Sequence, residues 1–144
     1  MRRHPAITIH RGASRDDIKE FVGCIRRRLP KSYSSFLTEC GWADINGDIV
    51  YGLGPDVTDR ESVLEQSVNE ATRARPPMAY YLVPLMPDGA GNHDCLDTRK
   101  VKDGDCPVVL WDHEHSRGEI QSPKLVSRSF TAWLARKVRE APEF

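Results

Sequence analysis

The sequence predicts an α+β fold in which antiparallel strands are packed by helices, in one domain of 144 residues. Two observations lead to this prediction: apolar residues recur at helical spacing near both ends of the chain, and short β-rich runs bounded by turn residues occupy its middle. Hydrophobic residues make up 39% and charged residues 29% of the chain, which is typical of a globular domain. No repeat, low-complexity tract or linker divides the sequence, so the predicted domain is residues 1–144 with a core over 14–140.

The first predicted helix begins after Ser14, whose hydroxyl can accept a hydrogen bond from a free N–H group of the first turn. Its apolar face is formed by Ile18, Phe21, Val22, Ile25 and Leu29. Arg26, Arg27 and Arg28 are expected in its last turn, where cations are favourable beside unpaired carbonyl groups. We interpret this run as a solvated helix end, and the alternative is a patch that binds a phosphate group or a partner.

A second helix is predicted after Pro30, with Gly41 as its C-cap. Its apolar face is formed by Tyr33, Phe36, Leu37 and Cys40. The two helices are therefore expected to pack as a helical hairpin.

A first strand is predicted at residues 49–53, directly after the turn signal Asn46-Gly47. Thr58 and Glu61 have the spacing of a capping box, which predicts a third helix that ends at the Arg-Pro-Pro sequence of residues 75–77.

The second half of the chain predicts a meander of strands and a closing helix. Strands are expected at residues 80–86, 93–97 and 107–112, with turn residues between them. Pro84 cannot donate to a strand ladder, so its strand is expected to end there or to lie at a sheet edge. The closing helix is expected to bury Phe130, Trp133, Leu134 and Val138, with Ser127 or Ser129 as its cap.

The net charge is zero, but it is +6 over residues 1–31, −9 over 32–119 and +3 over 120–144. A general nucleic-acid binder needs one contiguous basic face, so the acidic middle argues against that class. No apolar run is long enough for a membrane span or a signal peptide, which predicts a cytoplasmic location. The cysteines show no C-x-x-C spacing and are expected to be reduced thiols.

Several short motifs lie in a fixed order between residues 29 and 134. They are Leu29-Pro30-x-x-Tyr33-x-x-Phe36-Leu37, Gly52-Leu53, Cys95-Leu96-Asp97, Pro107-Val108-Val109-x-Trp111-Asp112-His113-Glu114 and Ser129-Phe130-x-x-Trp133-Leu134. Together they resemble the landmarks of the SUKH superfamily, the Smi/Knr-like fold. The resemblance implies an α+β fold with a central, mostly antiparallel sheet packed by helices, and it implies no catalytic set.

The resemblance also implies a role in protein binding. Bacterial members of the superfamily are very often immunity proteins that bind and block a cognate toxin, frequently a nuclease, and fungal members regulate cell-wall assembly and signalling. We therefore expect a non-enzymatic immunity protein that binds a toxin domain directly, with no nucleic acid or membrane as partner. The alternative is a regulatory or scaffold protein.

The richest polar constellation joins His93, Asp94, Cys95 and Asp97 to Asp112, His113, Glu114 and His115. A zinc site would use His113, His115 and either Asp94 or Asp97, but no standard ligand spacing is present. A cysteine hydrolase would pair Cys95 with His93 or His113, although a strand cysteine is most often buried and inert. No metal and no cofactor is therefore predicted.

The third interpretation of this region is an acidic binding surface. Its candidate residues are Asp88, Asp94, Asp103, Asp105, Asp112 and Glu114, which belong to the loops and strands of one meander. Their carboxylates together would attract a basic toxin and accelerate its association. The alternative is an ordinary solvated acidic face.

Overall fold

The computed structural model describes residues 7–113 and 123–140. Its helices are α1 (Arg15–Ile25), α2 (Lys31–Cys40), α3 (Val63–Thr72) and α4 (Phe130–Glu140), with a short 3₁₀ helix η1 (Thr98–Lys100). Its strands are β1 (Ile7–Ile9), β2 (Ala43–Ile45), β3 (Asp48–Val50), β4 (Leu82–Pro87), β5 (His93–Asp97), β6 (Val108–Trp111) and β7 (Lys124–Ser127). The predicted α+β class is confirmed, and all strand pairs within the described ranges are antiparallel.

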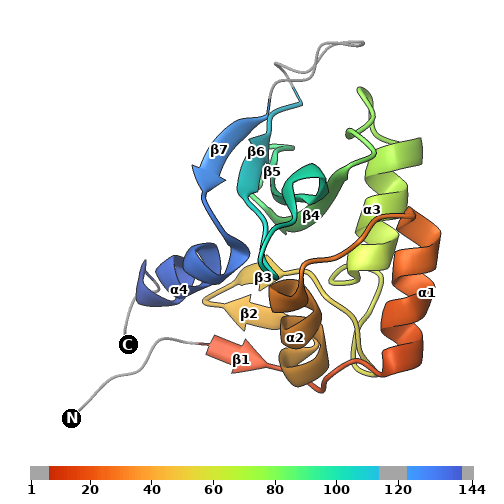
Figure 1. Ribbon diagram of the computed structural model, residues 1–144, viewed down its shortest axis with the longest axis vertical. Coiled ribbons are helices and arrows are strands. Elements are labelled where there is room, and N and C mark those ends of the chain that lie inside the picture. The colour runs from red at the N-terminus through yellow and green to blue at the C-terminus, as the bar shows by residue number, and fades with distance from the viewer. Residues whose placement is uncertain (1–6, 114–122, 141–144) are drawn as a thin grey trace.

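The strands are divided between two sheets, of order β1-β2-β3 and β4-β5-β6-β7. The two sheets meet where Tyr51, directly after β3, donates its backbone N–H to the carbonyl oxygen of Leu85 in β4 at 2.7 Å. Figure 1 shows α1 and α3 side by side at one end of the molecule and α4 at the opposite end. The central sheet that the sequence predicts is therefore present in two joined parts.

The turn signal Asn46-Gly47 forms the two-residue loop of the β2–β3 hairpin. Ile45 pairs with Asp48, and both loop residues have positive φ angles, 53° and 93°. The predicted strand after this turn is shorter than expected, because it ends at Val50. Strand β2, before the turn, was not predicted, because three residues are too few to show an alternating pattern.

The second sheet is the predicted meander with one further strand. Pro84 lies in β4 at the edge of this sheet, as its missing N–H group predicts. Strand β7 was not predicted, since only Leu125 and Val126 in it are apolar. The sequence also left open whether the N-terminal segment adds an edge strand, and β1 does so by pairing with β2.

The start of α1 was predicted correctly, but its end was not. Ser14 caps the helix by accepting a hydrogen bond from the backbone N–H of Asp17 at 3.1 Å. The helix ends at Ile25, and Arg26 takes a left-handed conformation with a φ of 55°. The chain leaves the helix early because Leu29 is buried and Pro30 opens α2. The three arginines therefore lie in the connection to α2, beyond the last turn of α1.

The start of α3 also differs from the prediction. Its N-cap is Ser62, whose hydroxyl accepts a hydrogen bond from the backbone N–H of Glu65 at 3.2 Å. Thr58 and Glu61 do interact, with the Thr58 backbone N–H 3.2 Å from the Glu61 carboxylate, but they close a separate turn before the helix. A capping pattern by itself does not distinguish a helix start from an isolated turn.

The main core lies between the sheets and α1, α2 and α4. Its centre is aromatic: the Phe130 ring meets the Tyr33 ring edge to face at 5.2 Å and lies 5.9 Å from the Trp133 ring. Tyr33 donates its hydroxyl to the carbonyl oxygen of Tyr51 at 2.8 Å, and burial raises the pKa of Tyr33. A smaller buried cluster lies on the other face of the second sheet and consists of Met78, Ala79, Leu82, Cys95, Val109 and Trp111.

Candidate functional site

Strand β5 holds much of the predicted polar constellation at the centre of the second sheet. His93 contacts Glu70 of α3, and Cys95 belongs to the smaller buried cluster on that side. Asp94 instead contacts Trp133 of α4. Successive side chains of β5 therefore lie on opposite faces of the sheet, as expected, so Asp94 lies on the other face from His93 and Cys95.

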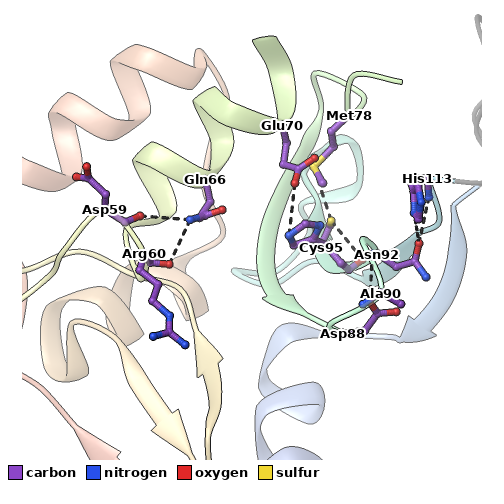
Figure 2. Close-up of polar contacts among 11 residues, drawn as sticks. Asp59, Arg60, Gln66, Glu70, Met78, Asp88, Ala90, Asn92, Cys95 and His113 are labelled. Atoms are coloured by element: carbon purple, nitrogen blue, oxygen red, sulfur yellow. Dashed lines mark hydrogen bonds and ion pairs between the residues drawn. The ribbon is translucent and has the colours of Figure 1, made fainter. Parts of the chain in front are cut away.

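The Cys95 thiol lies in an apolar environment. Its sulfur is 3.9 Å from the sulfur of Met78 and 3.6 Å from the carbonyl oxygen of His93 (Figure 2). Burial raises the pKa of the Cys95 thiol well above its ordinary value, and the nearby carboxylates of Asp94 and Glu70 raise it further. A cysteine nucleophile must be a thiolate, so this protonated thiol does not fit the hydrolase interpretation.

His93 and Glu70 form a buried pair between β5 and α3, with 3.6 Å between His93 Nε2 and Glu70 Oε1. Burial lowers the pKa of His93, against the effect of Asp88 and Asp94, and burial raises the pKa of Glu70. Burial therefore shifts each pKa in the direction of the neutral form of its group. His93 Nδ1 is covered and has no hydrogen-bond partner within residues 7–113 and 123–140. The contact of Glu70 was not predicted, because nothing local in the sequence connects a helical glutamate to a later strand.

The predicted turn between β4 and β5 is held by its own side chains. Asp88 Oδ1 accepts hydrogen bonds from the backbone N–H groups of Ala90, at 2.8 Å, and Asn92, at 3.1 Å (Figure 2). Burial would raise the pKa of Asp88, but these hydrogen bonds lower it. Asn92 Oδ1 also lies 2.8 Å from His113 Nδ1, so the loop fixes this histidine as well. The Asp88 carboxylate stabilises the turn, and its side chain remains exposed.

The zinc interpretation, which the sequence did not favour, gains no support. Within residues 7–113 and 123–140, no group of three or more His, Cys, Asp or Glu side chains is arranged to hold a metal ion. The Asp97 carboxylate is paired with Arg99, whose guanidinium donates hydrogen bonds to both carboxylate oxygens at 3.0 and 2.9 Å. His115, another proposed ligand, lies outside the described residues.

Asp105, a candidate for the acidic surface, caps α4 from a different loop. Its Oδ1 accepts hydrogen bonds from Phe130 N at 2.8 Å and from Ser32 Oγ at 3.0 Å, and its Oδ2 accepts one from Thr131 Oγ1 at 2.6 Å. Burial would raise the pKa of Asp105, but hydrogen bonds, the one from Thr131 foremost, lower it. This carboxylate joins α2, the loop before β6 and the start of α4.

Asp94, a second candidate, also fastens α4. Its Oδ2 accepts a hydrogen bond from Trp133 Nε1 at 2.9 Å and lies 3.8 Å from Lys137 Nζ. The Trp133 side chain is fully buried, so its N–H group needs this acceptor. Both carboxylates thus have structural partners.

The acidic candidates within residues 7–113 lie at both ends of β5. Asp88 lies beyond the His93 end of β5, whereas Asp103 and Asp105 lie beyond its other end. Asp103 is exposed in a turn with a φ of 53°, and Asp112 is half-buried and has an interaction partner. Glu114 lies outside the described residues. Attraction of a basic toxin by these residues stays a prediction.

A second charged region combines arginine with tyrosine. The Arg27 guanidinium lies 5.5 Å from the centre of the Tyr80 ring, and the Arg99 guanidinium lies 3.8 Å from the centre of the Tyr81 ring. The two tyrosine rings meet edge to face at 5.4 Å. We call Arg27, Tyr80, Tyr81 and Arg99 the Arg–Tyr surface. Sequence analysis placed Tyr80 in a strand, but it precedes β4 and is 76% exposed.

A sequence model described as the SMI1 / KNR4 family (SUKH-1) matches residues 12–136. The chain belongs to the SUKH-1 family. The resemblance drawn from the motifs is confirmed, and the match extends from before α1 into α4. The SUKH-1 family is in general one of non-enzymatic, protein-interacting immunity and regulatory domains.

The motif residues of this SUKH-1 chain hold its fold together. A Cβ atom at Gly52 would lie 1.7 Å from the carbonyl oxygen of Gly41, so only glycine fits there. Tyr33, Phe130 and Trp133 are core residues, and the Arg–Tyr surface lies outside the motifs. In the ranges described, none of the helices combines the length and the apolar character that crossing a bilayer requires.

Proposed function

We propose that this SUKH-1 domain is an immunity protein that neutralises a cognate toxin by binding to it directly. Membership of the SUKH-1 family over residues 12–136 is the observation that supports this most strongly. The bacterial proteins that the sequence resembles are very often immunity proteins, and their toxins are frequently nucleases. A cytoplasmic location and a single domain over residues 1–144 are parts of this proposal.

The buried thiol and the hydrogen-bonded carboxylates of this domain support binding over catalysis. The Cys95 thiol is buried and protonated, and the carboxylates of Asp94, Asp97 and Asp105 accept hydrogen bonds from partners within the fold. A protonated thiol is a poor nucleophile, and these carboxylates have structural roles in the fold. Stoichiometric binding needs none of them to react.

The experiment that tests the proposal is co-expression with a catalytically disabled copy of whatever toxin domain a neighbouring gene encodes. The expected result is a one-to-one complex on size-exclusion chromatography, together with loss of the intact toxin's activity when the protein is added. Absence of a complex with every neighbouring gene product would overturn the proposal and favour a regulatory or scaffold protein.

A Cys95→Ala variant separates neutralisation by binding from catalysis by this thiol. We expect it to neutralise the toxin as well as the wild type, because the thiol has no role in contact with a partner. Circular dichroism would first establish that the variant is folded. A folded variant that still binds the toxin but no longer neutralises it would contradict the proposal.

A further inference from the structure

An apolar cavity adjoins the Arg–Tyr surface, between α1 and α3. Its volume is 260 Å³, and its wall includes Ile25 of α1, Val68 and Ala71 of α3, and Met78 and Tyr80 of the segment before β4. Small-molecule sites typically enclose roughly 300–1,000 Å³, so this cavity suits one or two side chains of a protein better than a whole ligand.

Two large apolar residues are exposed at this cavity. Val68 is 40% exposed and Tyr80 is 76% exposed, although both belong to its wall. Exposed tyrosine beside a pocket is typical of the residues that dominate protein–protein binding energy, since its ring buries a large area at a small entropic cost. The cavity and Tyr80 therefore form one continuous apolar contact area.

Arg27 is fixed on Thr98 and lies beside the Tyr80 ring. Its Nε donates a hydrogen bond to Thr98 Oγ1 at 2.9 Å and its terminal nitrogen donates to the Thr98 carbonyl oxygen at 3.3 Å, while its guanidinium lies beside the Tyr80 ring. Tyr81 supports the same ring from its edge. An anchor that is already ordered loses less entropy on binding.

The charge beside the cavity is positive. Arg26 and Arg28 are exposed in the same connection as Arg27, and Arg99 lies over Tyr81. Asp97, the acidic residue at this place, is buried and already bonded to Arg99. The Asp97 carboxylate already neutralises Arg99 and takes up its paired N–H groups, so the positive charge of this rim comes from the exposed arginines after α1. Arginine recognises carboxylates through paired N–H groups, so this connection is complementary to acidic side chains.

One polar group in the cavity wall is unsatisfied. The Ser67 hydroxyl is covered by neighbouring atoms and has no hydrogen-bond partner in the described part of the chain. A covered hydroxyl without a partner is unfavourable, but an inserted segment would reach this atom only if the side chains that cover it moved.

We propose that the cavity and the Arg–Tyr surface together form the docking site for an acidic segment of a partner protein. The segment inserts an apolar side chain between α1 and α3 and places its carboxylates over Arg26 and Arg28, the exposed arginines after α1. This inference rests on the proposed function, because the segment belongs to the neutralised toxin. A protein segment fits better than a nucleic acid, since guanidinium groups already lie over Tyr80 and Tyr81 where bases would stack.

The test with the toxin uses Tyr80→Ala, Val68→Glu and Arg28→Glu, each at an exposed position. We expect each to weaken the toxin complex about tenfold or more in a calorimetric titration. The matched controls are Leu125→Ala on β7 and Arg139→Glu on α4, which are exposed elsewhere and should leave the affinity unchanged. A complex whose affinity is unaffected by the first set would overturn the docking site and leave the immunity function intact.

A second test needs no toxin. The full nitrogen-15-labelled chain is titrated with a short peptide of Asp and Glu around one Phe, with the same peptide carrying Lys in place of the acids, and with short oligo-dT. We expect saturating amide shifts at Ile25, Val68 and Tyr80 with the acidic peptide alone. Absence of these shifts, or stronger shifts there with the Lys peptide or oligo-dT, would overturn the proposal, whatever the toxin experiment shows.

Discussion

The carboxylates around α4 and the guanidinium groups around Tyr80 differ in where folding leaves them. The carboxylates are hydrogen-bonded within the fold, and the guanidinium groups lie near the surface. Asp94 and Asp105, expected to face a partner, accept hydrogen bonds from buried or terminal N–H groups of α4. Of the three arginines expected to be a solvated helix end, Arg26 and Arg28 are exposed, and Arg27 lies beside the exposed ring of Tyr80. A carboxylate on a short stem readily satisfies nearby backbone donors, whereas a long arginine stem carries its charge to the surface.

The largest effect is expected from Asp105→Ala, which removes the acceptor shared by Phe130 N, Ser32 Oγ and Thr131 Oγ1. Hydrogen bonds to a charged group contribute about 1.5–3 kcal/mol, and a loss of unfolding free energy in this range is expected. Urea denaturation measures it as a lower midpoint with an unchanged slope. Asp103→Asn, in the same loop, exposed and compatible with the left-handed backbone there, is the control. An equal loss in both variants would show that Asp105 has no special structural role.

A smaller effect is expected in acid. The folded-state pKa of Asp105 is lowered from its ordinary value of 3.8, so the folded chain binds fewer protons than the unfolded chain just below that pH. Its stabilising contribution is therefore present above pH 3.8 and is lost as the pH falls through the folded-state pKa. Asp105→Asn should show a flatter loss of stability in this window, measured by urea unfolding at a series of pH values. Parallel curves for variant and wild type would contradict the assignment.

The smallest effect on stability is expected from Tyr80→Ala. The ring is 76% exposed, so its removal should change the free energy of unfolding by no more than about 0.5 kcal/mol. The same variant is expected to weaken the toxin complex strongly, so binding and stability separate at this residue. A stability loss comparable to that of Asp105→Ala would mean that Tyr80 supports the fold, and the contrast between the two regions would disappear.

Elements with strong local signals were predicted well. Ser14 caps α1, Gly41 follows α2 with a positive φ of 73°, and Ser129 caps α4 by accepting from Ala132 N at 3.0 Å. Strands β2 and β7 were missed because each is short and its stabilising partner is another strand, which a local window does not contain.

The candidate site was less predictable than the fold. Acidic residues are suited to a surface that binds a basic partner. Their hydrogen-bond donors, however, come from residues far along the chain: Phe130 for Asp105 and Trp133 for Asp94. Tyr80 was expected in a strand, and only the course of the chain before β4 exposes it. Its contact with Arg27 joins segments with no shared sequence pattern.

The sequence by itself determined the family, the α+β class and most helices. Caps and apolar periodicity act on neighbouring residues, and motif residues such as Tyr33 and Gly52 fill fixed positions in the core. The tertiary structure decided which charged groups stay accessible. Asp94 and Asp105 have fixed partners and Arg28 lies exposed, since packing brings donors from α4 to the carboxylates and leaves the connection after α1 at the surface.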